Sequence, residues 1–150
     1  MRLLSPAFKM GGKIPSLYTC QGKDINPPLF ISDVPQEAKS LVLIMDDPDV
    51  PLSLRKDGMW VHWVVFNMPP ETKEILENTT PPGILGEGTG GKKKYQGPCP
   101  PDREHRYFFK LYALNSLLNL TSGATKEEVL QAMQNYIIIQ TELIGLYQKS

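Results

Sequence analysis

Residues 97–114 read GPCPPDREHRYFFKLYAL, and this stretch joins a proline-rich loop to a strand-like run. Cys99 is followed by two prolines, which restrict the backbone, and then by charged residues around His105, one of only two histidines in the chain. From 105 to 114 the residues alternate, so a strand there shares one face among His105, Tyr107, Phe109, Leu111 and Ala113. The stretch therefore predicts a strand that begins at a histidine behind a rigid corner.

Other segments repeat this strand character. Residues 41–48 (LVLIMDDP) form a continuous apolar run that ends in acids, as in a buried strand, and 27–35 is a shorter strand. Residues 60–70 (WVHWVVFNMPP) predict another strand, with one face made by Trp60, His62, Val64, Phe66 and Met68. Fourteen prolines and twelve glycines divide the chain into short pieces. This punctuation is typical of a mainly β protein.

The size and charge of the chain narrow its class. Its 150 residues correspond to one domain, 1–150, and sixteen basic residues balance sixteen acidic ones, which argues against a nucleic-acid partner. No window has the roughly 20 apolar residues that span a bilayer, and the N-terminus lacks a secretory signal core. We expect a soluble cytoplasmic protein in which Cys20 and Cys99 are free thiols rather than a bridge.

The C-terminal residues 125–150 have a different pattern. Thr125 and Glu128 form a capping box, and apolar side chains then recur near helical spacing through Tyr147. The pattern predicts one long helix, or two broken ones, packed on the sheet. A membrane-surface helix is the alternative, but the polar face lacks the Lys and Arg typical of such helices.

The long loop 81–101 contains two glycine motifs of nucleotide-binding proteins. Gly86, Gly88 and Gly91 satisfy G-x-G-x-x-G, and 86–92 satisfies the start of a P-loop. Both motifs need a helix N-terminus to hold phosphate, whereas Pro98 follows closely here. We expect a flexible glycine loop, with the lysines at 92–94 on a solvated face from which they can gather anions near a pocket.

Three polar clusters lie at the ends of predicted strands. They are the acids Asp46, Asp47 and Asp49, then His62 beside Trp60, and then the stretch from Cys99 to His105. Neighbouring strands can bring these clusters to one edge of the sheet, with both histidines facing one pocket. Each cluster also has a structural interpretation: a buried structural histidine, an Asp-Pro-Asp turn and a rigid proline corner.

The motifs DDPDVP, Trp-x-His-Trp-Val-Val and GPCPP followed by HRYFFKLYAL, in this order, resemble the phosphatidylethanolamine-binding protein family, which includes Raf kinase inhibitor protein. The similarity is to its short bacterial and archaeal branch. It extends along the chain through IPSLYTCQGKDINPPL at 14–29, VPQEAKSLVLIMDDPD at 34–49 and ELIGLY at 142–147. It implies a large antiparallel sheet packed on a smaller one, with a C-terminal helix and short helices.

The resemblance also implies a small anion pocket that accepts phosphate-like groups and the head group of phosphatidylethanolamine. Its implied lining is Asp47, Trp60, His62, Gly97, Cys99, Pro100, His105 and Tyr107, with Asp49 just behind. In that pocket both imidazoles and the tyrosine hydroxyl donate to phosphate, and backbone N–H groups of 97–99 form a nest for it. Gly97 allows close backbone approach, and Asp47 orients His62 and fixes its tautomer, or meets an ammonium group.

This sequence departs from the family at three places. Tyr136 stands where the short branch often has a histidine near the C-terminal helix. Asp102, Arg103 and Glu104 stand where many relatives have glycines, which leaves the shape of the pocket rim open. The extra C-terminal helix of the eukaryotic members is absent, so a kinase-regulating surface is not carried over. The resemblance allows a homodimer and the sequestering of a phosphorylated partner in kinase signalling, but it identifies no protein partner.

The leading hypothesis is therefore binding of small anions or phospholipid head groups without catalysis and without a cofactor. The first alternative is a thiol-dependent hydrolase, with Cys99 as nucleophile, His105 as base and Asp47 as the orienting group. The second is a divalent-metal site built from the two histidines and the aspartates, although no H-E-x-x-H spacing supports it.

Overall fold

Two β-sheets of unequal size, joined by loops and one short α-helix, account for the fold of all 150 residues in the computed structural model. The strands and helices in chain order are β1 (Arg2–Leu4), β2 (Gly12–Lys13), the 3₁₀ turn η1 (Ser16–Tyr18), β3 (Leu29–Ser32), β4 (Ser40–Asp47), β5 (Trp60–Met68), β6 (Glu74–Ile75), β7 (Ile84–Leu85), β8 (His105–Leu114), α1 (Lys126–Met133) and β9 (Ile137–Tyr147). None of the helices has the length and apolar character that crossing a membrane requires.

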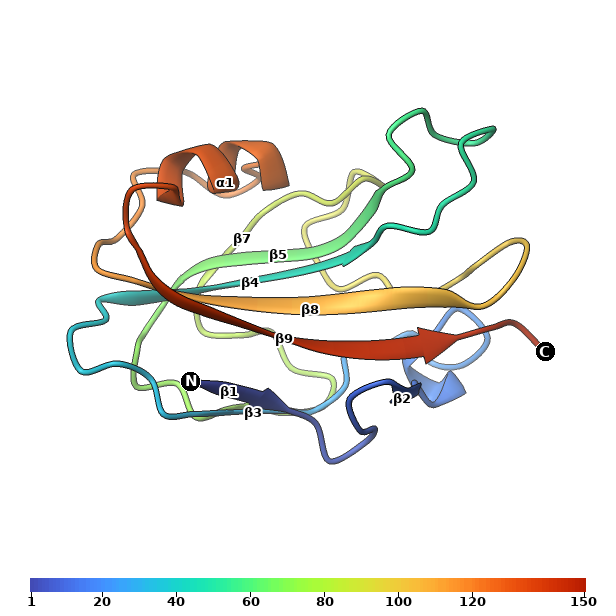
Figure 1. Ribbon diagram of the computed structural model, residues 1–150, viewed down its shortest axis with the longest axis horizontal. Helices are drawn as coiled ribbons and strands as arrows, with labels where there is room; N and C mark the ends of the chain where they lie inside the picture. The colour runs from blue at the N-terminus through green and yellow to red at the C-terminus, as the bar shows by residue number, and fades with distance from the viewer.

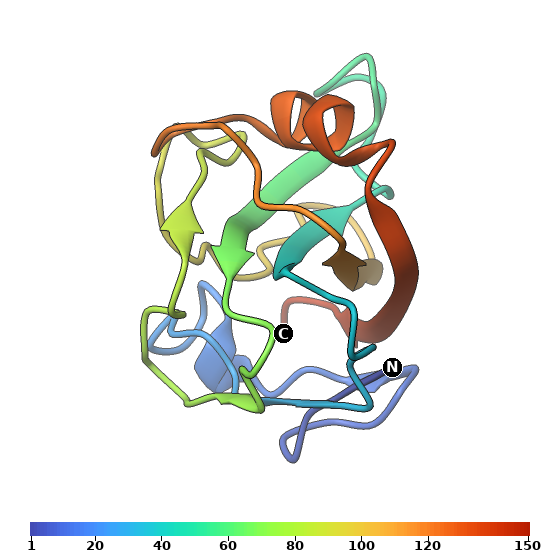
Figure 2. The ribbon, with the colours of Figure 1, turned by 90° about the vertical axis from the view of Figure 1, so that its left-hand side faces the viewer.

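The large sheet has the strand order β2-β9-β8-β4-β5-β7, and the small sheet has the order β1-β3-β6. All pairings are antiparallel except that of β2 with β9. The small sheet covers one face of the large sheet and α1 covers the other (Figures 1 and 2). A separate apolar cluster fills each of these two interfaces. The predicted fold class, a large antiparallel sheet on a smaller one with a C-terminal helix, is confirmed.

The central strands follow the sequence pattern closely. Every residue of β4 is buried, as its unbroken apolar run predicts for a strand that has neighbours on both edges and cover on both faces. Tyr107, Phe109, Leu111 and Ala113 of β8 all join the cluster under the small sheet, so the predicted face of this strand is confirmed. The shorter strand expected at 27–35 is β3.

The predicted face of β5 is partly wrong, because two β-bulges interrupt its alternation. The register with β4 shifts between Met45 and Asp46, opposite His62, and again between Leu41 and Leu43. Each bulge adds one residue and so reverses which face the following side chains occupy. Val64 and Phe66 consequently pack under α1, whereas Trp63, Val65 and Met68 pack under the small sheet.

The C-terminal segment is helical only at its start. The predicted capping box is present, since Thr125 Oγ1 accepts from the Glu128 N–H and the Glu128 carboxylate accepts from the Thr125 N–H. The helix ends at Met133, and β9 then runs beside β8 over eleven residues. The prediction of a long helix, or two broken ones, is therefore wrong beyond this point. The β-branched run at 137–139 favours an extended backbone.

The two cysteines form a disulfide between Cys20 and Cys99, which corrects the expectation of free thiols. The Cys20 N–H also donates to Pro98 O at 3.1 Å, so the segment after η1 and the proline corner are tied together twice. The sequence reasoning failed because it inferred free thiols from an expected compartment, while the pairing depends on proximity across 79 residues. A cytoplasmic location stays a prediction, without support from free thiols.

The glycine loop is hydrogen-bonded rather than free. Gly86 N–H donates to Val64 O, Glu87 N–H to Ala124 O and Thr89 N–H to Val61 O, so the loop lies along β5 and the segment before α1. No helix follows Gly91 before α1, so the helix N-terminus that both nucleotide motifs need is absent. The expectation of a flexible loop is not supported at these positions.

Candidate functional site

Antiparallel pairing brings the three polar clusters to one edge of the large sheet. β4 ends at Asp47, and its two neighbours β5 and β8 begin at Trp60 and His105, so the three termini meet there. Asp47 is paired directly with Trp60. The convergence expected from the sequence follows from the strand order and not from any local motif.

A cavity of about 390 Å³ lies at this edge. All eight residues predicted to surround a ligand line it: Asp47, Trp60, His62, Gly97, Cys99, Pro100, His105 and Tyr107. It is also lined by Val50, Leu54, Arg55, Gln96 and Pro101. Asp49 lies behind the wall, as predicted, where its carboxylate accepts from the backbone and guanidinium of Arg106 at 2.8–2.9 Å. That guanidinium holds the pKa of Asp49 below its usual range.

His105 is fully buried, and both of its ring nitrogens face carboxylates. Nδ1 lies 2.6 Å from Asp47 Oδ2 and Nε2 lies 2.7 Å from Asp102 Oδ1. Two ionised carboxylates are satisfied together only when both ring nitrogens carry protons. The imidazole is thus already committed within the protein, so the prediction that it donates to an anion is wrong. Asp102, part of the departure at 102–104, accepts the hydrogen bond from Nε2.

The Asp47 carboxylate is the negative group of the cavity. Its Oδ1 accepts from the Asp49 N–H at 2.7 Å, and its Oδ2 accepts from His105. Burial raises the pKa of Asp47 above its ordinary value, and the hydrogen bonds from His105 and Asp49 act in the opposite direction. Because each oxygen has a second lone pair, the carboxylate can still accept from a ligand.

His62 presents a hydrogen-bond acceptor to the cavity. Its Nδ1 lies 2.6 Å from the carbonyl oxygen of Gln96, and since a carbonyl only accepts, Nδ1 carries the proton. Burial lowers the pKa of His62 to about 4, so the ring is neutral at pH 7. Nε2 then holds a lone pair, which suits an ammonium or hydroxyl donor and not an unprotonated phosphate oxygen.

Tyr107 supplies a buried donor. Its side chain is fully enclosed between the two imidazoles, with ring centroids 5.3 Å from His62 and 6.4 Å from His105. The hydroxyl has no hydrogen-bond partner within the protein. Burial, and then the nearby Asp47 charge, raise the pKa of Tyr107, so it keeps its proton. A buried hydroxyl without a partner is uncommon and points to a group supplied from outside.

The proline corner forms one wall, but not in the way expected. The Gly97 N–H donates to Asp24 Oδ1 at 2.7 Å, so it is not part of an anion nest. A Cβ at this glycine would collide with Tyr18 O and with that carboxylate, and this packing requires glycine, not close approach of a ligand. The disulfide at Cys99 fixes the wall from the other side.

Sequence reasoning missed the cation at the cavity mouth. The Arg55 guanidinium carbon lies 5.7 Å from the ring centre of Trp60, and Arg55 Nε donates to Met59 O at 2.8 Å. The guanidinium also pairs with Asp57 at 3.3 Å, and these contacts together hold it against the aromatic wall. In the sequence, the arginine five residues before the tryptophan of β5 could have indicated this cation.

The prediction that Asp47 orients His62 is wrong, because the Gln96 carbonyl fixes the tautomer of His62 and Asp47 contacts His105 instead. Gln96 gave no signal because it acts through its backbone.

The geometry bears on both alternatives to binding. The hydrolase hypothesis needs a thiolate at Cys99, and the Sγ atom is instead bonded to Cys20. For the metal hypothesis, no group of three or more His, Cys, Asp or Glu side chains is placed to hold an ion.

Comparison with known proteins identifies the family. A sequence model described as phosphatidylethanolamine-binding protein matches residues 4–148. UPF0098 proteins of Chlamydia trachomatis and Methanothermobacter thermautotrophicus are 50% and 48% identical, over 99% of this chain and 99% of theirs. A crystal structure of a phosphatidylethanolamine-binding protein homologue from Chlamydia trachomatis superposes with a TM-score of 0.96, at 50% identity over 99% of this chain and 97% of that one.

A solved structure of a more distant relative supports the same family assignment. Escherichia coli YbcL, a member of the same family, is 25% identical and has a TM-score of 0.89, covering 99% of this chain and 98% of its own. The match therefore includes both the sequence motifs and the arrangement of the two sheets. The chain belongs to the phosphatidylethanolamine-binding protein family.

Proposed function

We propose that the cavity binds, without catalysis, a small ligand that carries both a phosphate and an ammonium group, such as the head group of phosphatidylethanolamine. The observation that carries the proposal is that one cavity holds both donors and acceptors with remaining hydrogen-bonding capacity. The donors for phosphate are the Tyr107 hydroxyl and Nη1 of Arg55, since Nε and Nη2 of that guanidinium face Asp57 at 3.3 and 3.4 Å. His62 Nε2 and the Asp47 carboxylate are the acceptors for ammonium.

Charge favours this zwitterionic ligand over a simple anion. The lining carries one carboxylate, Asp47, and one guanidinium, Arg55, which also pairs with Asp57 at 3.3 Å, so the cavity has no excess of positive charge. A cavity of that kind offers no net attraction to free phosphate, whereas a head group with both charges can pair each with its opposite. A role toward a phosphorylated protein in signalling, and a homodimer, remain predictions from the resemblance alone.

The test is a titration followed by NMR at the His62 imidazole and the Tyr107 ring. Phosphorylethanolamine should shift both signals at lower concentration than inorganic phosphate does. The proposal fails if neither ligand perturbs these rings at millimolar concentration, or if phosphate binds more tightly than phosphorylethanolamine.

A further inference from the structure

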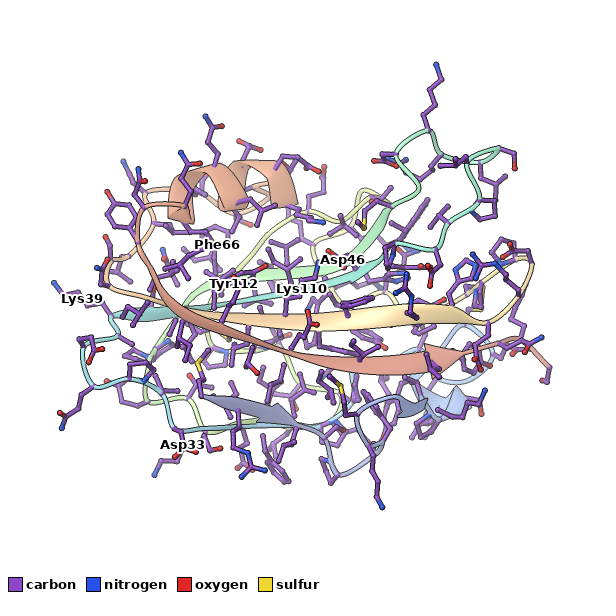
Figure 3. All side chains as sticks on the ribbon, in the orientation of Figure 1. Asp33, Lys39, Asp46, Phe66, Lys110 and Tyr112 are labelled. Carbon is purple, nitrogen blue, oxygen red and sulfur yellow. A yellow bond between two sulfur atoms is a disulfide. The ribbon has the colours of Figure 1, made fainter.

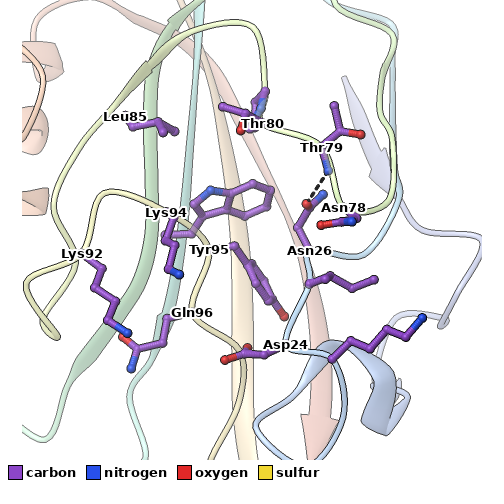
Figure 4. A pocket seen from close by; sticks show the side chains of 14 residues that line it. Asp24, Asn26, Asn78, Thr79, Thr80, Leu85, Lys92, Lys94, Tyr95 and Gln96 are labelled. Atoms are coloured by element: carbon purple, nitrogen blue, oxygen red, sulfur yellow. Dashed lines mark hydrogen bonds between the residues drawn. The ribbon is translucent and has the colours of Figure 1, made fainter.

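A second and larger cavity, of about 450 Å³, lies on the other side of the segment Tyr95–Gly97 from the first. We propose that it is a separate anion-binding site for a small molecule carrying one or two phosphate groups. Three chain segments enclose it, at 23–26, at 78–81 and at 92–96, together with two side chains of the large sheet (Figure 4). None of its residues except Gln96 belongs to the first cavity.

The floor of this cavity is aromatic and fixed. Trp63 of β5 and Tyr95 are both buried, and their rings meet edge to face with centroids 5.2 Å apart. The Tyr95 hydroxyl donates to Tyr18 O at 2.7 Å, so its polar end is already satisfied inside the protein. The floor therefore gives shape to the site but leaves the recognition of a ligand to the rim.

The rim carries unpaired positive charge. Lys23, Lys92 and Lys94 line the cavity, and none of them forms a salt bridge, whereas Lys13, Lys110 and Lys126 elsewhere in the chain do. The single carboxylate of the lining, Asp24, accepts from the Gly97 N–H. The lining thus has an excess of two positive charges in a chain whose formal net charge is zero. Such a local excess attracts and holds anions.

The wall opposite the lysines is built from neutral polar groups in a braced loop. Figure 4 shows Asn26, Asn78 and Thr79 facing Lys92, Lys94 and Gln96 across the aromatic floor. Asn26 is buried and braces this wall, since its Oδ1 accepts from the Thr79 N–H at 2.9 Å and its Nδ2 donates to Leu76 O at 3.0 Å. The Asn78 amide and the Thr80 hydroxyl line the cavity without a partner of their own, and both can donate to phosphate oxygens.

All three lysines of the run 92–94 are exposed, as predicted, but their side chains point in different directions. Lys93 is absent from the cavity lining, and its side chain lies across Gly123, where a Cβ added to the glycine would be 3.0 Å from the lysine Cε atom. Its two neighbours in the run point to the cavity instead. The alternation therefore supplies, within three consecutive residues, two lysines that belong to the proposed site and one that does not.

The test uses inorganic pyrophosphate as the probe, with isothermal calorimetry and amide chemical shifts on the full chain. One double variant is Lys92→Gln with Lys94→Gln. The matched control is Lys93→Gln with Lys73→Gln, which removes the same charge from positions outside the cavity. We expect binding by the unmodified protein, with shifts at 78–80, at 92–96 and at the Trp63 indole. The first double variant should weaken binding at least tenfold and the control less than twofold.

The proposed site and the first cavity can fail separately. Tyr107→Phe, which alters only the first cavity, should leave pyrophosphate affinity unchanged. The inference is overturned if both double variants weaken binding equally, because general surface charge then explains it. It is also overturned if the shifts centre on Asp47 and Tyr107, or if no pyrophosphate binds at millimolar concentration.

Discussion

Asp46 and Asp47 are consecutive in β4, yet their carboxylates lie on opposite faces of the large sheet. Asp47 faces the first cavity, whereas Asp46 Oδ2 accepts from Lys126 at 2.7 Å and from Lys110 at 3.1 Å beneath α1. Figure 3 shows Asp46 and Lys110 on the side of the sheet that faces the helix. Two adjacent acids of the sequence motif thus have unrelated roles, one in a ligand cavity and one in a buried ion cluster.

Asp46→Asn should destabilise the fold without changing ligand binding. The carboxylate is fully buried, and its loss leaves Lys126, which is only 12% exposed, without a counter-charge. Breaking such a buried pair costs about 3 kcal/mol of unfolding free energy. Urea unfolding measures the loss, and Asp33→Asn is the control because Asp33 is exposed and its φ of 56° suits asparagine. An unchanged midpoint for Asp46→Asn would contradict the assignment.

Asp47→Asn should change the preference of the cavity among ligands. Removing the negative charge should weaken phosphorylethanolamine binding about tenfold, as expected for a lost charge-assisted hydrogen bond. Inorganic phosphate should bind equally well or better, because a repulsive charge is gone. Calorimetry with both ligands measures the ratio of the affinities, and Asp33→Asn again serves as the control. A parallel loss of both affinities would indicate a structural role only.

Tyr107→Phe should remove one donor and nothing else. The hydroxyl has no partner in the protein, so its deletion leaves no protein group unsatisfied and should change stability by less than about 1 kcal/mol. Binding of phosphorylethanolamine should weaken about tenfold. Tyr112→Phe is the matched control, since Tyr112 packs in the cluster under α1 on the other face of the sheet (Figure 3). Equal affinities for both variants would exclude the hydroxyl as a ligand contact.

The unfolding free energy of the protein should decrease as pH is lowered through the range in which His62 titrates. Its pKa is about 4 in the folded protein, against 6.5 ordinarily, so below pH 6.5 the unfolded chain binds more protons than the folded one. Unfolding free energy should therefore decrease by up to about 1.4 kcal/mol per pH unit as pH falls from 6.5 toward 4. Asp49 and Asp102, whose pKa values are lowered, lose their contributions only below about pH 4.

Urea unfolding at pH 7.0, 6.0 and 5.0 gives this slope, and His62→Gln should flatten it. Persistence of the full slope in that variant would show that another group titrates in this range.

The disulfide should stabilise the fold and the proline wall together. It joins residues 79 apart, and closing a loop of that length contributes up to about 4 kcal/mol by restricting the unfolded chain. Cys20→Ser with Cys99→Ser should lower the unfolding free energy toward that amount and weaken phosphorylethanolamine binding, because Cys99 lines the cavity. The unmodified protein in reducing agent should behave like the variant. Unchanged affinity in both would show that prolines alone hold the wall.

The sequence predicted the structure best in segments whose apolar residues follow a single strand pattern. The faces of β8 and the burial of β4 were predictable from alternation and from an unbroken apolar run. The convergence of Asp47, His62 and His105 was predictable from strand ends and from family resemblance. The failures have a different cause, because they depend on which atoms meet in space.

His105 is such a case, since its sequence position shows neither that Asp102 reaches back to its Nε2 nor that Asp47 occupies its Nδ1. The segment of β9 misled for another reason. Its apolar side chains fit helical spacing, but the buried positions Leu143, Gly145 and Tyr147 alternate in the manner of a strand. Two periods coexist in this stretch, and pairing with β8 selects the second.

The bulge in β5 allows this one strand to contribute side chains to two separate cavities. A regular strand turns alternate side chains to a given side, whereas the extra residue opposite Met45 and Asp46 lets the adjacent His62 and Trp63 both face the small sheet. His62 lines the first cavity and Trp63 lines the second, and the segment Tyr95–Gly97 separates the two. If β5 were one residue shorter at the bulge, this strand would contribute a side chain to only one of the two cavities.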